Sequence, residues 1–476
     1  MKRKMSTVMR RWIAGLTLLA VVAAAAGCGN DCAHLVTGIR IDEAGNNALK
    51  VQVKVTTSAA ADVHIEYRLQ NSTGDWFATP VSKQGTAHKL VLTNLQFRQP
   101  YVFRIVTAKD GCSAVSKEYT FTSPGAPLWL KDMYSVVCPD TSVLPAAFKN
   151  GYMLLYKRDA PGILSIIDYN GDLHWYHQVN GTGFKTATFT QNNTILAILG
   201  TAAYQTSYGN EILELSLAGD TVFHLKKGEA GLQQTIHHEI LLNNHNQVVT
   251  ICADERILDL SARGGSKADT VKSDGIIVLD KKGNAVWKWS VFDALNPLDD
   301  ASIVKDRNDW MHANSLCLDT DGNYLLSFYN NGQIWKIDAH TGKVIWKFGK
   351  GGEFAMPEGS VFDNSHAIHL NSHGALMLFD NGTSKQRSRT LAFTLDAQNK
   401  KATLAMQVLL PPDMYSERMG SAYLVNDTAV LQCCSKRNVA ALTNLQGRFL
   451  WALKAGGSPY RVNFLHPEQV RPYIGR

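Results

Sequence analysis

Apolar and polar residues alternate along several short segments in the first quarter of the chain. Four of these segments have an apolar residue at every second position: residues 49–55, 63–67, 101–105 and 119–121. Strict alternation is typical of a strand with one buried face, and turn-forming residues separate the segments. We therefore expect a small β-sandwich over residues 33–124, within an N-terminal domain of residues 28–124.

The rest of the chain repeats a second pattern: an apolar strand, a turn, and another strand that often contains tryptophan. Copies begin at Gly162, Glu211, Gly275, Gly332, Arg389 and Asn438. Another apolar strand precedes each copy, at residues 152–156, 194–199, 247–252, 324–328, 375–379 and 429–432. Six copies of a four-stranded unit predict a six-bladed β-propeller over residues 128–476. Residues 123–127 are the expected linker, and the predicted fold class is all-β.

A ring of blades allows such repeats to bury both faces of each sheet. One four-stranded sheet cannot bury both of its faces, whereas six sheets in a ring bury them against one another and leave only short edges. We expect the tryptophans to be core residues between blades, and the innermost strands to line a central channel. A barrel or a stack of sandwiches is the alternative, and the regular repeat argues against it.

The first 27 residues predict an export signal. Five basic residues precede the apolar segment 12–26, and Ala25-Ala26-Gly27-Cys28 follows. Small residues before a cysteine are typical of lipoprotein signals, so we expect an exported protein with a lipid on Cys28, anchored to a membrane and facing the periplasm or the cell surface. Cleavage without lipidation is the alternative. No later segment is apolar enough to cross a bilayer.

Removing this segment changes the charge of the protein. The formal charge falls from +7 to +2, because five basic residues and no acidic residue are lost. The mature chain therefore has no basic excess of the kind that nucleic-acid binding requires.

Seven cysteines remain besides Cys28, and an oxidising compartment would allow disulfides. Cys32 and Cys112 bracket the first domain, and we expect them to be bonded. The pairing of the others stays open: Cys138, Cys252, Cys317, Cys433 and Cys434. An odd number leaves a thiol free or bonded between the chains of a homodimer. No spacing of cysteine and histidine matches a zinc site, so no metal is expected.

Three blades of the predicted propeller carry a histidine shortly before the second apolar strand. His238 lies in Ile-His-His-Glu-Ile, His312 in Trp-Met-His-Ala-Asn-Ser, and His366 in Asn-Ser-His-Ala-Ile-His. A lone histidine near a strand is more often a packing residue. Equivalent positions of blades converge on the axis of the ring, however, so we expect these three imidazoles to face one site.

Several motifs resemble the bacterial arylsulfate sulfotransferase family: His238-Glu239-Ile240, Met311-His312-Ala313-Asn314-Ser315, Ser365-His366 and Phe379-Asp380-Asn381-Gly382. The resemblance covers the whole mature chain. It implies a small N-terminal β-domain followed by a six-bladed propeller, which transfers a sulfuryl group from an aryl sulfate to a phenol without a nucleotide donor or another cofactor. In the first domain, residues 95–101 resemble the corner of fibronectin type III domains, which favours an immunoglobulin-like sandwich.

The family resemblance also implies roles for individual residues. His366 matches the nucleophile that becomes sulfated, His238 and His312 match the general acid/base and sulfate-binding histidines, and Asn314 matches a substrate-binding asparagine. The chemistry agrees, because neutral imidazole can attack sulfur and a second imidazole can protonate the departing phenolate. His369 is a second candidate nucleophile, although three residues along an extended strand should point it to the opposite face.

One feature departs from the family. Its members have an arginine that contacts the sulfate on the strand after the middle histidine, whereas residues 327–331 here read Ser-Phe-Tyr-Asn-Asn. Arg389, Arg418 or Arg461 are candidates to supply this charge from another blade.

Two other functions stay open. A non-catalytic propeller could bind a ligand or partner with these histidines in place. A quinone-dependent dehydrogenase also has tryptophan-bearing repeats, but it usually has eight blades and a calcium site. Release of a phenol from an aryl sulfate, faster when a second phenol is added, would separate the transferase from the binding protein.

Overall fold

The computed structural model describes residues 32, 34–44, 47–204, 207–457 and 459–474. The predicted signal segment, residues 1–27, and the predicted lipidation site, Cys28, lie outside these residues. The chain forms two compact units that divide between Pro127 and Leu128, at the end of the predicted linker. No helix in the described part has the length and apolar composition needed to cross a membrane.

The N-terminal unit is built on one long strand. Its strands are β1 (Val36–Glu43), β2 (Val51–Leu69), β3 (Phe77–Ala78), β4 (Ser82–Leu92), β5 (Pro100–Lys109), β6 (Cys112–Val115) and β7 (Tyr119–Thr122). The first part of β2 pairs with β1 and β4, and its second part pairs with β5 and β3. Alternate residues of β2, such as Val53 and Ile65, are buried in one apolar core. This arrangement is consistent with the predicted sandwich.

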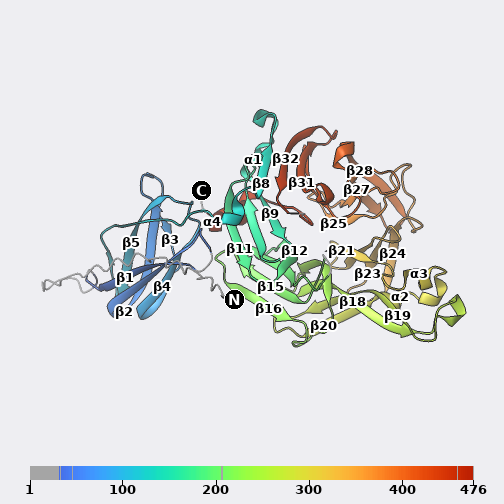
Figure 1. Cartoon of the computed structure of the whole chain (residues 1–476), viewed down its shortest axis with the longest axis horizontal. Helices are drawn as coiled ribbons and strands as arrows, with labels where there is room; N and C mark the ends of the chain where they lie inside the picture. The colour runs from blue at the N-terminus through green and yellow to red at the C-terminus, as the bar shows by residue number, and fades with distance from the viewer. Residues whose placement is uncertain (1–31, 33, 45–46, 205–206, 458, 475–476) are drawn as a thin grey trace, which may run out of the picture. The chain divides into compact units, whose positions relative to one another are not determined.

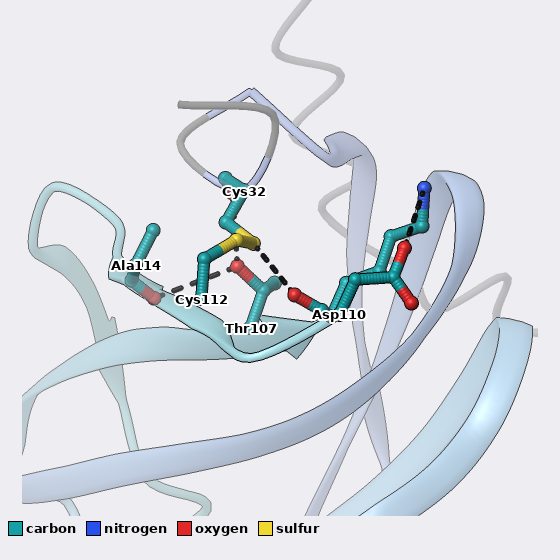
Figure 2. Close-up of a disulfide and its surroundings, with 6 residues drawn as sticks. Cys32, Thr107, Asp110, Cys112 and Ala114 are labelled. Atoms are coloured by element: carbon teal, nitrogen blue, oxygen red, sulfur yellow. Dashed lines mark hydrogen bonds and ion pairs between the residues drawn. A yellow bond between two sulfur atoms is a disulfide. The ribbon is translucent and has the colours of Figure 1, made fainter. Parts of the chain in front are cut away.

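A disulfide joins Cys32 to Cys112, which confirms the predicted bond (Figure 2). The hydroxyl of Thr107 donates a hydrogen bond to the backbone oxygen of Cys32 at 3.1 Å. The bond connects residues 80 positions apart, and so ties the start of the domain to the end of its main hairpin. The other cysteines of the described chain are free thiols.

The second unit is a six-bladed β-propeller, as predicted. Blade 1 contains β9 (Tyr152–Lys157), β10 (Gly162–Ile167), β11 (Leu173–Val179) and β33 (Asn463–Leu465). Blade 2 contains β12 (Gly183–Phe189), β13 (Thr194–Gly200), β15 (Glu211–Ser216) and β16 (Thr221–Lys226). Blade 3 contains β14 (Tyr208–Gly209), β17 (Ile236–Leu242), β18 (Val248–Leu258), β19 (Asp269–Leu279) and β20 (Ala285–Ser290).

The remaining blades follow the same plan. Blade 4 contains β21 (Ala313–Leu318), β22 (Tyr324–Phe328), β23 (Gln333–Ile337) and β24 (Val344–Gly349). Blade 5 contains β25 (His366–Leu370), β26 (Leu376–Asp380), β27 (Arg389–Asp396) and β28 (Lys401–Leu409). Blade 6 contains β29 (Ser421–Asn426), β30 (Ala429–Cys434), β31 (Val439–Asn444), β32 (Phe449–Ala455) and β8 (Tyr134–Val137). The helices are short: α1 (Ala146–Asn150), α2 (Val291–Ala294), α3 (Ile303–Asp306) and α4 (Pro467–Ile474).

Both ends of this unit close the ring. The C-terminal β33 pairs with β9 and is the innermost strand of blade 1, while β8 pairs with β32 and is the outermost strand of blade 6. In Figure 1 the red strands of blade 6 accordingly lie beside the teal β8 and β9. The chain therefore cannot complete blade 1 until its last strand is in place.

The core of the propeller lies between the blades. Six apolar clusters fill the spaces between neighbouring blades, one for each pair, and the cluster between blades 6 and 1 completes the circle. The middle strands are buried on both faces, as in β13, whereas the outermost strands such as β16 alternate between buried and exposed residues. This explains why the middle strands have continuous apolar sequences.

Three tryptophans each connect their own blade to the next one. The indole nitrogens of Trp175, Trp289 and Trp451 donate hydrogen bonds of 2.8 Å to backbone oxygens of Leu217, Gly342 and Tyr169, respectively. Each acceptor lies in the turn before the outermost strand of the following blade. The regular tryptophan in the repeat is thus an interblade contact.

A buried ion pair connects three blades near the axis. Arg461 precedes β33 in blade 1, and its Nη1 donates to Oε2 of Glu239 on β17 in blade 3. Its Nη2 donates to the backbone oxygen of Asn314 on β21 in blade 4 at 3.0 Å. The guanidinium and the carboxylate are both largely removed from water, with side-chain exposures of 4% and 10%.

We expect the ion pair to contribute strongly to the stability of the ring. Removing one partner of a buried pair leaves an uncompensated charge, which costs about 3–5 kcal/mol. Glu239→Gln should therefore lower the free energy of unfolding of the propeller by about this amount, measured by urea denaturation. The control is the double variant Glu239→Gln with Arg461→Met, which removes both charges and should be less destabilised than the sum of the Glu239→Gln and Arg461→Met single variants. Unchanged unfolding midpoints in the single variants would contradict this account.

Candidate active site

Matching positions on the innermost strands place the candidate residues. His238, Asn314 and His366 each lie ten residues before the first residue of the following strand: Val248, Tyr324 and Leu376. The pairing of β17, β21 and β25 is irregular at these positions, with shifts between His237 and Ile240, between Ala313 and Ser315, and between His366 and His369. Such β-bulges insert unpaired residues and redirect side chains, and they are frequent next to active sites.

The structure brings the three predicted histidines together. The ring centres of His238 and His312 are 5.1 Å apart. Tyr329 lies 5.3 Å from His312 and 5.5 Å from His366. Tyr460 lies 5.9 Å from His238 and 6.2 Å from His366. We call these five side chains the histidine cluster; it contains residues of blades 3, 4 and 5 and the segment before β33.

His366 is held with one ring nitrogen facing carbonyl oxygens. Its Nδ1 lies 2.7 Å from Oδ1 of Asn381 and 3.1 Å from the backbone oxygen of Asn364. Asn381 is oriented in turn, because its Nδ2 donates to the backbone oxygens of Ser416 and Met419 at 2.6 and 2.8 Å. Since carbonyls only accept, Nδ1 must carry the proton, and Nε2 keeps its lone pair.

His366 is also neutral. Burial is the largest of the effects that lower its pKa to about 3, and the nearby charges of Arg461 and His312 lower it further. The hydrogen bond to Asn381 acts in the opposite direction. A neutral imidazole with a free Nε2 lone pair is the form that can act as a nucleophile.

The pKa of His312 is shifted in the opposite direction from that of His366. Nδ1 of His312 lies 2.8 Å from Oδ2 of Asp309. Burial alone would lower the pKa of His312, but the hydrogen bond to Asp309 and the charges of Asp309 and Asp274 outweigh this and raise it above the ordinary value. Of the two imidazoles, His312 is therefore the one that holds a proton more readily.

His238 is paired with its neighbour in the chain. Its Nδ1 lies 2.7 Å from Nδ1 of His237, and Nε2 of His237 lies 3.3 Å from Oδ1 of Asp274, without the angle of a hydrogen bond. The carboxylate favours a proton on Nε2 of His237, so His238 donates from Nδ1 and keeps a lone pair on Nε2. Burial lowers the pKa of His238 well below its ordinary value, and neighbouring cationic groups, Arg461 among them, lower it further.

The backbone is strained at two of these histidines. His238 and His312 have φ angles of 60° and 54°, and Met311 has 75°. Residues other than glycine adopt such angles rarely, and those that do are concentrated at functional sites.

Asn314 is fully buried beside the nucleophile segment. Its Nδ2 donates to the backbone oxygen of Ser365 at 2.8 Å, and its Oδ1 has no hydrogen-bond partner in the described chain. Asn314 therefore holds the residue that precedes His366.

The three candidate arginines have different surroundings. Arg389 is away from the histidines and fully engaged: it pairs with Asp380 at 2.7 Å and donates to two backbone oxygens and a glutamine. Arg461 borders the cluster, with its guanidinium 5.0 Å from the Tyr460 ring, but Glu239 neutralises its charge. Arg418 is exposed. At the position of the missing arginine, Tyr329 contacts the histidines instead.

The expectation that His369 points to the opposite face from His366 is wrong. The two residues pair with Phe379 and Met377, which share one face of β26, because the bulge inserts a residue between them. His369 is nevertheless outside the cluster. Its ring lies 4.9 Å from that of Tyr423, and it lines a cavity of about 240 Å³ that none of the three cluster histidines borders.

Sequence reasoning missed the residues that orient the site. Asn381 stood within a motif that resembles the family, His237 lies next to His238, and Asp309 lies three residues before His312, so each had a weak signal. Tyr329 and Tyr460 had none, because nothing in a repeat indicates which aromatic residues reach the axis. No group of three or more histidine, cysteine, aspartate or glutamate side chains suited to a metal ion is found among the described residues.

Solved structures resemble this chain only distantly. A protein of unknown function from Bacteroides caccae has 9% identity and a TM-score of 0.43, with 66% of this chain and 98% of that chain covered. An auxiliary nutrient binding protein from Bacteroides thetaiotaomicron has 9% identity and a TM-score of 0.34, with 88% and 92% covered. Virginiamycin B lyase from Staphylococcus aureus has 9% identity and a TM-score of 0.33, with 67% and 99% covered.

No curated protein matches the chain. The sequence profile of the arylsulfotransferase (ASST) family, by contrast, matches residues 141–446, which is more than half of the chain and includes all three cluster histidines. The chain therefore belongs to the arylsulfotransferase family.

Proposed function

We propose that this protein transfers a sulfuryl group from an aryl sulfate to an acceptor phenol through a sulfated His366. Family membership supports sulfuryl transfer in general. The observation that carries the finer proposal is the hydrogen bond between Nδ1 of His366 and the Asn381 carbonyl, which leaves Nε2 as a free lone pair. No cofactor is needed for this chemistry.

In the first half-reaction, Nε2 of His366 attacks the sulfur atom of the donor. A nitrogen–sulfur bond forms as the bond between sulfur and the aryl oxygen breaks. The departing phenolate takes a proton from His312 and leaves as a phenol. The positive charge that develops on the His366 ring is stabilised by the Asn381 carbonyl at Nδ1.

In the second half-reaction, the acceptor phenol loses its proton to the now neutral His312. Its oxygen attacks sulfur, the nitrogen–sulfur bond breaks, and His366 regains its lone pair. His238 is neutral and can accept a hydrogen bond from either phenol through Nε2. Each histidine thus has a role that matches its surroundings, and the enzyme returns to its starting protonation state.

Export and lipid anchoring of this enzyme stay a prediction from residues 1–28. The disulfide between Cys32 and Cys112 supports export, because such bonds persist in oxidising compartments. The substrates would then be aryl sulfates and phenols outside the cytoplasm.

The kinetics should show a nucleophile at His366. We expect parallel lines in double-reciprocal plots for phenyl sulfate and an acceptor phenol, since the first phenol leaves before the second enters. His366→Ala should abolish turnover, whereas His369→Ala, a matched change three residues away, should keep it. His312→Ala should lower the rate by about 100- to 10,000-fold. Wild-type transfer by His366→Ala, with correct folding shown by circular dichroism, would refute the proposal.

The two half-reactions should depend on pH in opposite directions. The pKa of His312 is raised, so its proton is present below that pKa and lost above it. With phenyl sulfate, kcat/KM for the donor should therefore fall about tenfold per pH unit above the pKa of His312, whereas kcat/KM for the acceptor should rise through it. Asp309→Asn removes the charge that raises this pKa, so the fall for the donor and the rise for the acceptor should both shift to lower pH.

4-Nitrophenyl sulfate is the matched control for the pH experiment. Its phenolate is a weak base and needs little protonation, so the fall in kcat/KM for the donor should be much smaller. The pKa of His366 is about 3, so its protonation should contribute no limb near neutral pH. Donor profiles that are identical for the two substrates would contradict the role of His312 as a proton donor.

A further inference from the structure

Among the described residues of the propeller, two buried cationic side chains form no ion pair. Arg158 is 9% exposed and Lys185 is 3% exposed. Arg158 makes one hydrogen bond in the described chain, to the thioether sulfur of Met419 at 3.2 Å, and Lys185 makes none with its side chain. Arg389 and Arg461, in contrast, are each paired with a carboxylate. The side-chain nitrogens of Arg158 and Lys185 are not among the fully buried polar atoms that lack a partner, so solvent, or an anion, can reach both cationic ends.

The charge of Asp159 acts on Lys185 but does not pair with it. Asp159 interacts with it only at long range, and its carboxylate is exposed and forms no ion pair within 4 Å in the described chain. Burial is the main cause of a lowered pKa of Lys185, and the charge of Arg158 contributes to the shift. The two cations thus lie close enough to repel each other.

Lys185 lies one residue away from the blade 2 position that matches His238, Asn314 and His366. It lies on the innermost strand β12, at a pairing irregularity between Phe184 and Thr186, nine residues before the start of β13. A bulge redirects this lysine in the same way that bulges redirect the cluster residues. The innermost strand of blade 2 therefore carries a cation close to the position at which blades 3, 4 and 5 carry histidine or asparagine.

The amino end of Lys185 approaches the histidine cluster along blade 2. A Cβ on Gly200 would lie 3.0 Å from Cε of Lys185 and 2.9 Å from the backbone oxygen of Tyr208. The ring of Tyr208 lies 5.6 Å from that of His238. A glycine at position 200 leaves room for the lysine side chain to pass toward this neighbour of the cluster.

Arg158 approaches the cluster from blade 1. It follows β9, and a Cβ on Gly183 would lie only 1.7 Å from its backbone oxygen, so the segment lies directly against β12. Its guanidinium carbon is 5.9 Å from the centre of the Tyr460 ring, which contacts both His238 and His366. The Met419 sulfur that it contacts belongs to a residue whose backbone oxygen holds Asn381.

We propose that Arg158 and Lys185 bind the sulfuryl oxygens of the aryl sulfate donor, and so replace the arginine that blade 4 lacks. This inference rests on the proposed function. A sulfate ester carries one negative charge spread over three oxygens, which suits a planar guanidinium fork and a compact ammonium together. The positive charge for the sulfuryl oxygens thus comes from blades 1 and 2, whereas Tyr329 occupies the position of the family's arginine in blade 4.

Binding of inorganic sulfate tests the site without requiring turnover. In calorimetric titrations of the full chain at ionic strength fixed with sodium chloride, Arg158→Met and Lys185→Met should each raise the Kd for sulfate by about 10- to 100-fold. Lys226→Met is the matched control, because Lys226 is an exposed lysine on β16 of the same blade as Lys185. Unchanged Kd values in both Arg158→Met and Lys185→Met would overturn the inference.

Thermal unfolding separates anion binding from a structural role. Without sulfate, Lys185→Met should melt at the same temperature as the wild type or higher, because an uncompensated buried charge has been removed. Sulfate should raise the Tm of the wild type and not that of this variant. A variant that melts lower without sulfate, and is still stabilised by sulfate, would show that Lys185 is structural.

Different results would refute the proposed function and the proposed anion site. Transfer by the wild type, with sulfate affinity unchanged in both variants, would overturn the anion site and leave the proposed function standing. Sulfate binding by the wild type that depends on Arg158 and Lys185, without transfer from any aryl sulfate tested, would contradict the proposed function and leave the anion site.

Discussion

The ion pair between Arg461 and Glu239 joins the last strand of the chain to a blade on another side of the axis. Arg461 also donates to the backbone of Asn314, so one guanidinium links blades 1, 3 and 4. Hydrogen bonds between neighbouring innermost strands, such as those of Ser315 with Glu239 and with the backbone N–H of Ile368, act together with this ion pair. The separations among His238, His312 and His366 depend on this crossing, since each histidine lies on a different blade. Closing the ring therefore also sets the geometry of the site.

The second constraint is that neighbouring imidazoles have pKa values shifted in opposite directions. Burial lowers the pKa of His366 and a carboxylate raises that of His312, although the two rings share the neighbour Tyr329. Such divergence between similar groups assigns acid and nucleophile roles in many enzymes. A propeller can achieve it because each blade brings its own hydrogen-bond partners to the axis. The chemistry follows from the partners Asn381 and Asp309 rather than from the histidines alone.

Sequence patterns predicted the features that repeat. Six blades, the interblade tryptophans and the disulfide follow from periodicity and cysteine position, and the structure contains all of them. The features that do not repeat could not be predicted. The pairing of β33 with β9 joins positions about 300 residues apart, so Tyr460 and Arg461 had no recognisable register. The bulges also escaped prediction, because an inserted residue changes which face a side chain occupies without changing the apolar pattern; His369 is the example.

The most direct test of the account is to find the sulfuryl group on the enzyme. The protein would be mixed briefly with an aryl sulfate and no acceptor, digested, and examined by mass spectrometry. We predict one added sulfuryl group on the peptide that contains His366, located at that residue by fragmentation, labile in acid and removed by a phenol. Absence of any adduct while the enzyme turns over, or an adduct on His369 or His312 instead, would contradict the assignment of His366 as the nucleophile.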